Sequence, residues 1–194
     1  MKIGIIGSGD VGRVLGAGFI KEGHEVLLGT RDINKEAVVN WLANNPNSQV
    51  GSFADAAAFG ELIVLATAGD ITEAVIESAG IANFDSKIVI DATNPISHAK
   101  PPVNSVLQFF NTAAGSLMEH LQNLVPDAKF VKAFNSVGNA LMYKPDLPGG
   151  KPTMFICGND DLAKKTVTEI LDAFGWETED YSEDLRESST NKNK

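Results

Sequence analysis

The chain has 194 residues, of which 43% are hydrophobic and 21% charged, the composition of a globular protein long enough to bury a core without disulfides. Its formal net charge of −9 argues against general binding to nucleic acids or anionic membranes, although an anionic ligand still fits a locally basic pocket. Cys157 is the single cysteine, so no intramolecular disulfide forms, and no signal peptide or membrane-length apolar run stands out; we expect a cytoplasmic protein.

Short, apolar, β-branched runs alternate with amphipathic stretches, which is typical of a mostly parallel, doubly wound α/β sheet with helices on both faces. The predicted strands are 2–7, 24–29, a short strand near 49–50, 61–67, 87–93, 129–134, 152–158 and 176–181. The predicted helices are 10–23, 34–45, 53–60, 70–80, 115–125, a short one within 135–145, and 159–175. We expect one Rossmann-type domain over 1–181, with an irregular segment at 94–114, and a disordered polar tail over 182–194.

The turn after the first predicted strand reads GSGDVG, residues 7–12, and matches G-x-G-x-x-G at the start of a helix. Gly7 would allow the tight turn, Gly9 would let the backbone approach a pyrophosphate, and Gly12 would let helix and strand pack closely. The amino end of the helix offers N–H groups to phosphates. The alternative is a tight turn that binds no ligand. The strand and helix on either side favour dinucleotide binding.

The second predicted strand ends in LLGTRD, residues 27–32, where NAD-binding chains place an acidic residue for the ribose. Gly29 stands near that place instead. Thr30 can donate a hydroxyl, Arg31 can bind a phosphate through two hydrogen bonds, and Lys35 lies about one helical turn further on. This group favours the 2′-phosphate of NADP. Asp32 keeps the alternative of a ribose contact open, and a solvated helix start would also explain the two cations.

Other polar residues are weaker candidates. Lys132 could orient a substrate, but the alternation of side chains along a strand favours the face away from the site. Asn135 and Asn139 could bind a substrate or cap a short helix, and His98 could lie near a site or be solvated. Cys157 is expected to be a buried small apolar residue. No set of His, Cys and carboxylate residues has metal-ligand spacing, so we expect no metal.

Four stretches together resemble the F420-dependent NADP reductase family, including its bacterial NADP-binding oxidoreductases, and the cytosolic domain of the STEAP metalloreductases. They are IGIIGSGDVG, LLGTRD with Lys35, DATNP (91–95) and VKAFNSVGNALM (131–142). The resemblance covers the chain up to about residue 180. Family members often continue with an apolar helix near the acceptor site, whereas this chain ends in LRESSTNKNK. We therefore expect an acceptor site that is more open, differently built, or completed by a partner chain.

The resemblance implies roles for residues at both ends of a bound NADP(H). The residues implied along the pyrophosphate are Ser8, Gly9, Asp10 and Val11, within the turn from Gly7 to Gly12. Those implied at the 2′-phosphate are Thr30, Arg31 and Lys35. Those implied near the nicotinamide, its ribose and the hydride acceptor are Ala66, Thr67, Asn94, Pro95, Ala133, Phe134 and Asn135. All these segments follow carboxyl ends of predicted strands, where open parallel sheets bind ligands.

The expected function is an NADPH-dependent oxidoreductase that transfers hydride between NADP(H) and a soluble small-molecule acceptor, which is a flavin, a deazaflavin such as F420, or a related molecule. Such a transfer needs aligned rings more than acid–base groups, so the catalytic residues stay unassigned. One alternative is a non-catalytic NADP(H)-binding redox sensor or regulatory module. Another is a carbonyl or imine reductase whose site is built across a homodimer. We expect no nucleic-acid partner and no insertion into a membrane.

Overall fold

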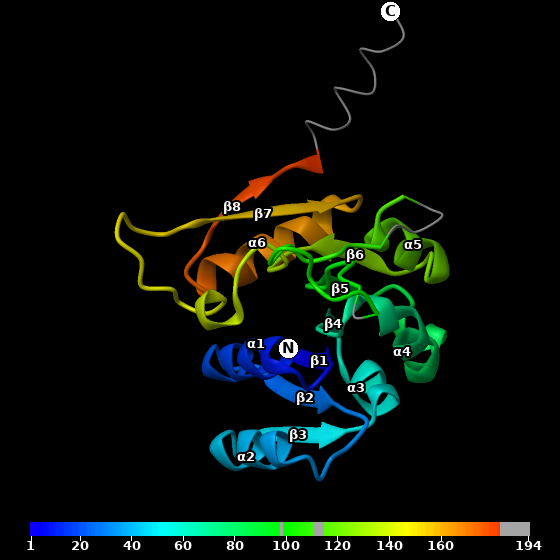
Figure 1. The fold of residues 1–194 in the computed structure, drawn as a ribbon. Helices are drawn as coiled ribbons and strands as arrows, with labels where there is room; N and C mark the ends of the chain where they lie inside the picture. The colour runs from blue at the N-terminus through cyan, green and yellow to red at the C-terminus, as the bar shows by residue number, and fades with distance from the viewer. Residues whose placement is uncertain (98, 111–114, 183–194) are drawn as a thin grey trace, which may run out of the picture.

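The computed structural model describes residues 1–97, 99–110 and 115–182. An eight-stranded sheet runs through them in the order β3-β2-β1-β4-β5-β6-β7-β8 (Figure 1). The strands are β1 (Lys2–Ile6), β2 (Glu25–Gly29), β3 (Ser48–Gly51), β4 (Leu62–Leu65), β5 (Ile88–Asp91), β6 (Lys129–Lys132), β7 (Thr153–Gly158) and β8 (Glu177–Asp180). The α-helices are α1 (Asp10–Lys21), α2 (Glu36–Asn44), α3 (Phe53–Phe59), α4 (Thr72–Ala79), α5 (Leu117–Leu124) and α6 (Asp161–Ala173), and the 3-10 helices are η1 (Gly69–Ile71), η2 (Ile81–Phe84) and η3 (Asn139–Leu141).

Helices cover both faces of the sheet because its strands are apolar on both sides. Ile3 and Ile5 of β1 pack into a buried cluster with α1, α2 and α6, whereas Ile6 packs into a second cluster with α3, α4 and α5. Figure 1 shows these two sets of helices on opposite sides of the strands. A Cβ atom on Gly4 would lie 2.1 Å from the carbonyl oxygen of Ala56, so this glycine lets α3 pass directly over β1. The predicted fold class, a Rossmann-type doubly wound sheet, is confirmed.

The observed strands end earlier than predicted where the chain approaches the carboxyl edge of the sheet. β4, β5 and β6 end at Leu65, Asp91 and Lys132, two residues before each predicted end. The two residues that follow each strand belong to loops that build the edge of the sheet. One pair of neighbouring strands, β6 and β7, is antiparallel, and the other pairs are parallel.

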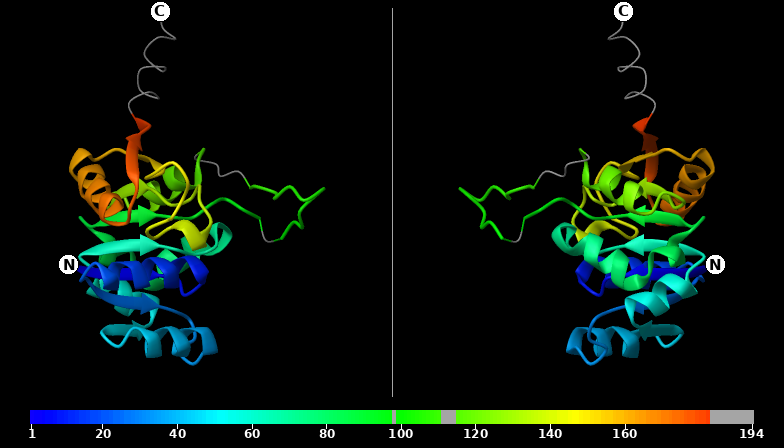
Figure 2. Two further views of the ribbon diagram at one scale, coloured as in Figure 1. Left: turned by 90° about the vertical axis from the view of Figure 1, so that its left-hand side faces the viewer. Right: turned by 90° about the vertical axis from the view of Figure 1, so that its right-hand side faces the viewer.

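The irregular segment after β5 contains a short hairpin. The N–H groups of Val103 and Val106 each donate to the other residue's carbonyl oxygen, at 3.0 and 2.9 Å. Asn104 and Ser105 between them have φ values of 50° and 64°, which the two central residues of a type I′ turn require. Figure 2 shows this part of the chain projecting from the body of the molecule.

Two predictions fall on undescribed residues: the role of His98, and the tail beyond Ser182. Among the residues that the structure describes, no helix combines the length and the apolar character needed to cross a membrane. The same residues contain no group of three or more His, Cys, Asp or Glu side chains arranged to hold a metal ion.

Candidate functional site

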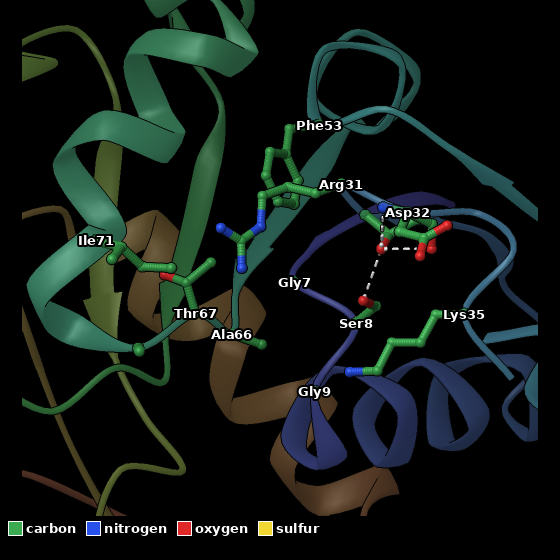
Figure 3. A pocket seen from close by; sticks show the side chains of 12 residues that line it. Gly7, Ser8, Gly9, Arg31, Asp32, Lys35, Phe53, Ala66, Thr67 and Ile71 are labelled. Carbon is green, nitrogen blue, oxygen red and sulfur yellow. Dashed lines mark hydrogen bonds between the residues drawn. The ribbon is translucent and has the colours of Figure 1, made fainter. Parts of the chain in front are cut away.

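The loops that follow β1, β2 and β4 enclose a cavity at the carboxyl edge of the sheet, which we call the first pocket (Figure 3). Sequence positions that lie far apart meet here because β1 lies between β2 and β4 in the sheet. The residues that line the pocket are Gly7, Ser8, Gly9, Thr30, Arg31, Asp32, Lys35, Phe53, Ala66, Thr67, Ala68 and Ile71. Eight of the residues expected to bind a dinucleotide are therefore neighbours around one cavity.

The three glycines of the turn have different surroundings. Gly7 has a φ of +123°, and a Cβ atom there would lie 2.4 Å from the carbonyl oxygen of Ala66. A Cβ atom on Gly12 would lie 1.9 Å from the carbonyl oxygen of Gly7, so both glycines are required for the turn itself. A Cβ atom on Gly9 would meet no atom within 4 Å. The backbone at Gly9 is thus open to a ligand, and no side chain caps the amino end of α1.

Two cations face the first pocket without a partner in the protein. Within the described part of the chain, the side chains of Arg31 and Lys35 make no hydrogen bond or ion pair. In Figure 3 the guanidinium of Arg31 points toward Thr67, and the ammonium of Lys35 points toward Gly9. The carboxylate of Asp32 accepts the N–H of Asn34 at 2.9 Å. The pocket therefore offers two cations against one carboxylate, which favours an anionic ligand.

Thr30 is placed differently from these two cations. It is buried, and its hydroxyl shares a hydrogen bond with the hydroxyl of Ser8 at 2.8 Å. The same oxygen accepts the N–H of Asp32 at 3.2 Å. Thr30 thus joins the glycine turn to the end of β2, and its hydroxyl is already occupied in this structure.

A second pocket of about 450 Å³ opens beyond β5 and β6 along the same edge. Its walls are mainly apolar, with a few polar groups, which is the usual composition of a small-molecule site. The residues that line it are Asn94, Pro95, Phe109, Phe110, Gly115, Ser116, Leu117, Met118, Lys132, Asn135 and Cys157. Burial raises the pKa of the Cys157 thiol, so this cysteine is weakly acidic and not an activated nucleophile.

Lys132 lines the second pocket, and the prediction that its side chain lies on the face away from the site was wrong. The reason is its partner across the sheet. Asp91 and Lys132 are the last residues of β5 and β6 and stand opposite one another in register. The ammonium of Lys132 donates to the Asp91 carboxylate at 2.9 Å and to the carbonyl oxygen of Thr93 at 2.5 Å. This buried carboxylate holds the lysine toward the cavity.

The segments that follow β4 and β5 touch one another. A Cβ atom on Gly69, the first residue of η1, would lie 2.1 Å from the carbonyl oxygen of Asn94. The side-chain amide of Asn94 donates to the carbonyl oxygen of Asn135 at 2.7 Å, which joins the β5 loop to the β6 loop. Asn94, Pro95 and Asn135 line the second pocket, and Asn94 is the one that packs against the segment following β4.

The turn after β6 is conformationally strained. Phe134 is fully buried and has a φ of 64°, a region that bulky L-residues rarely adopt. Its N–H donates to the sulfur of Met154 at 3.4 Å. This strained turn directs Asn135 into the second pocket, and such strain commonly lies at functional sites.

Five expected residues do not line either pocket. Asp10 has an exposed side chain that pairs with Arg13, and Val11 packs against the core. The other three, Gly12, Ala133 and Phe134, are buried. Sequence reasoning missed the aromatic wall formed by Phe53 in the first pocket and by Phe109 and Phe110 in the second, because their segments lack a strand-end signal.

The sheet order, the glycine turn and the cation-bearing pocket define a dinucleotide-binding Rossmann protein. A family model described as NADP oxidoreductase, coenzyme F420-dependent, matches residues 2–95. A solved structure of a proposed F420-dependent NADP reductase from Arthrobacter sp. FB24 is 33% identical, with a TM-score of 0.86, and the match covers 94% of this chain and 85% of that one. The chain belongs to the F420-dependent NADP oxidoreductase family.

Two curated relatives are similar over most of this chain. The F420-dependent NADP reductase of Methanocaldococcus jannaschii is 29% identical over 179 residues, which is 88% of this chain and 78% of that protein. The metalloreductase STEAP3 of Rattus norvegicus is 30% identical over 176 residues, or 90% of this chain. This chain spans only 32% of the length of STEAP3. The expected resemblance to both groups is confirmed.

Proposed function

We propose that this protein is an NADPH-dependent oxidoreductase that transfers hydride between NADP(H) and a planar acceptor, a flavin or a deazaflavin such as F420. The observation that carries the proposal is the presence of two pockets of different chemistry on neighbouring segments at the carboxyl edge of one sheet. The first pocket has a glycine turn and unpaired cations, and the second is mainly apolar. The segments behind them are in contact, because Gly69 packs against Asn94. A charged dinucleotide suits the first pocket and a flat ring suits the second.

The residues of the first pocket fit NADP(H). The open backbone at Gly9 and the uncapped amino end of α1 would bind the pyrophosphate. Arg31 and Lys35 would bind the 2′-phosphate, since neither has a partner among the described residues. Thr30 would hold Ser8 and Asp32 in place through its hydroxyl. The nicotinamide end would then run past Ala66 and Thr67 toward Asn94.

Bound NADPH would supply the hydride, so the chain's own residues need to align and enclose the acceptor. Phe109, Phe110 and Leu117 provide apolar walls that would shield a bound acceptor from water. Asn94 and Asn135, joined by a hydrogen bond, would lie where the two rings meet. The name of the methanogen relative describes the same pair of reactants for that protein.

The proposal is tested by following NADPH absorbance with FMN, FAD, a deazaflavin, a quinone and a ferric chelate as acceptors, with NADH in parallel. We expect turnover with at least one flavin or deazaflavin and a preference for NADPH. Tight NADPH binding without turnover on any acceptor would contradict the proposal and support a redox sensor. Turnover of small aldehydes or imines alone would support the carbonyl or imine reductase.

A further inference from the structure

Asp91 and Lys132 form a largely buried ion pair, and Lys132 lines the second pocket. The Asp91 side chain is 0% exposed and that of Lys132 is 15% exposed. The other oxygen of Asp91 accepts the N–H of Thr93 at 2.9 Å and its hydroxyl at 2.7 Å. The carboxylate is therefore fully engaged and rigidly placed.

The ammonium of Lys132 has one N–H group that is not used by any described residue of the protein. An ammonium has three N–H groups, and among the described residues Lys132 uses two, toward Asp91 and the Thr93 carbonyl oxygen. Because Lys132 lines the cavity, the third is available to a molecule in the second pocket. Buried ion pairs often contribute little to stability compared with apolar residues of similar size. A cation held in this way beside an apolar cavity is better explained by a ligand than by stability.

We propose that Lys132, aimed by Asp91, binds the hydride acceptor and selects acceptors that carry a carbonyl or imide group conjugated with the hydride-accepting atom. This inference rests on the proposed function, because it assigns the acceptor to the second pocket. Asp91 acts through Lys132 and is a positioning residue.

The chemistry of hydride acceptance explains the selectivity. A neutral acceptor that takes a hydride gains two electrons and one proton, while the nicotinamide is oxidised, so the acceptor becomes an anion. In a flavin or deazaflavin, conjugation places that charge on the carbonyl oxygens and ring nitrogens of the imide ring, until a proton from water neutralises it. An ammonium at hydrogen-bond distance stabilises the anion more than the neutral ring, and lowers the barrier.

The test uses four variants, of which Lys132→Gln and Lys129→Gln make the same change of charge. Lys132→Gln removes the cation, and Asp91→Asn combined with Lys132→Gln removes it without leaving a buried, unpaired carboxylate. Lys129→Gln is the control, because Lys129 lies at the other end of β6, where its ammonium is 3.5 Å from the Asp160 carboxylate. Lys132→Arg restores the charge.

Binding is read without turnover through Cys157, the single cysteine of the sequence, which lines the same pocket. The rate of its alkylation is measured with and without lumiflavin, a tricyclic ring with an imide, or phenazine, a tricyclic ring without one. The ratio of the two rates is compared within each variant, because Lys132 itself affects the pKa of the thiol.

Bound lumiflavin should protect Cys157 from alkylation. We expect Lys132→Gln and the double variant to weaken this protection about 10-fold and to lower kcat/KM for a flavin acceptor about 10- to 100-fold. Protection by phenazine and the Kd for NADPH should stay within about twofold of the unaltered protein, since neither needs a cation at this place. Lys129→Gln should change none of these quantities, and Lys132→Arg should recover part of the loss.

Three results would overturn the inference. They are equal loss of lumiflavin and phenazine protection, full recovery of flavin turnover in the double variant, and unchanged lumiflavin protection in Lys132→Gln. Failure of the proposed function has a different signature, which is absence of NADPH oxidation by the unaltered protein with every acceptor. The comparison of lumiflavin with phenazine still decides the role of Lys132 in that case.

Discussion

At the scale of single residues, the first pocket separates groups that hold the protein together from groups that remain available to a ligand. The hydroxyl of Thr30 is taken by Ser8 and Asp32, whereas the side chains of Arg31 and Lys35 have no partner in the described part of the chain. Unpaired cations beside a cavity break no hydrogen bond within the protein when they bind a phosphate. The full free energy of their hydrogen bonds to the phosphate therefore contributes to binding of the ligand.

Arg31→Ala tests this assignment. We expect the Kd for NADPH to rise about 10- to 100-fold, because a charge-assisted hydrogen bond is worth about 1.5–3 kcal/mol, and the Kd for NADH to change less than about twofold. The measurement is titration of nicotinamide fluorescence with both dinucleotides. Lys165→Ala, an exposed cation on α6, is the control for the lost charge. If Arg31→Ala weakened the binding of NADPH and NADH equally, Arg31 would not be the residue that binds the 2′-phosphate.

The sequence predicts these residues better than it predicts Lys132. Arg31 and Lys35 follow a strand end at a spacing that a known motif defines, and local pattern is enough to bring them to the edge. The side of the sheet that Lys132 faces depends on where β6 ends and on which residue lies opposite. Its partner Asp91 is 41 residues away in the chain, and the two residues are neighbours only because the register of β5 and β6 places them opposite one another.

At the scale of secondary-structure elements, the turn between β1 and α1 has one glycine for packing and another for the ligand. Gly12→Ala should lower the free energy of unfolding by about 1–3 kcal/mol, because its Cβ atom would lie 1.9 Å from a backbone oxygen that cannot move aside. Gly9→Ala should leave that free energy within about 0.5 kcal/mol, since its φ of −69° suits alanine and no atom lies within 4 Å.

Gly9→Ala, the variant with the smaller effect on stability, should have a large effect on NADPH binding. In Gly9→Ala the added methyl group occupies the space above the turn, so we expect NADPH binding to weaken more than about 10-fold while the fold is kept. Urea unfolding and fluorescence titration measure the two effects separately. Unchanged NADPH affinity in Gly9→Ala would show that the pyrophosphate does not lie over this turn.

The edge strand β8 is tied to α6 by Lys164. The ammonium of this buried lysine lies 2.5 Å from the Asp180 carboxylate and 3.2 Å from that of Asp161. Its hydrogen bond to Asp180 raises the pKa of Lys164. Burial alone would raise the pKa of Asp180, but hydrogen bonds to Lys164 and Ser182 lower it overall, below its usual 3.8.

Asp180→Asn should therefore destabilise the protein in a pH-dependent way. A carboxyl group with a lowered folded-state pKa stabilises the fold above its usual pKa of 3.8, and this contribution is lost as the pH falls through the folded-state value. At pH 7 we expect a loss of about 1–2 kcal/mol, less than for a fully buried pair because Asp180 is 30% exposed.

The difference should shrink when unfolding is measured in urea at about pH 3. Asp172→Asn, which breaks the exposed pair with Lys151, is the control and should cost less than about 0.5 kcal/mol at either pH. A difference for Asp180→Asn that persists or grows in acid would contradict the ion-pair explanation.

At the scale of the whole molecule, alternation of strand and helix was sufficient to predict the class of fold, because each element carries its own apolar pattern. The antiparallel placement of β7 and the projecting hairpin at Val103–Val106 had no such signal. Both follow from the route of the chain between distant elements, which local pattern does not encode. The second pocket depends on these features, since Cys157 lies in β7 and Phe109 pairs with Ile96 in the segment that carries the hairpin. For that reason the second pocket was harder to predict than the first.

The first pocket joins segments that only the folded chain brings together, from the turn at Gly7 to the end of η1 at Ile71. A ligand that contacts all of them binds the folded state and not the unfolded chain, so it should stabilise the entire molecule. At free NADPH about 100 times its Kd, the free energy of unfolding should rise by about 2.7 kcal/mol. For a chain of this length that corresponds to a rise in Tm of about 5–10 °C in a thermal scan.

NADH at the same concentration should raise the Tm much less, because it cannot engage Arg31 and Lys35 through a 2′-phosphate. The Gly9→Ala variant, whose own stability is kept, should lose most of the NADPH effect, which separates binding at the turn from a general effect of a polyanion. An equal rise with NADH and NADPH would mean that the two cations do not contact the dinucleotide. A rise that survives in Gly9→Ala would place the stabilising contact outside the glycine turn.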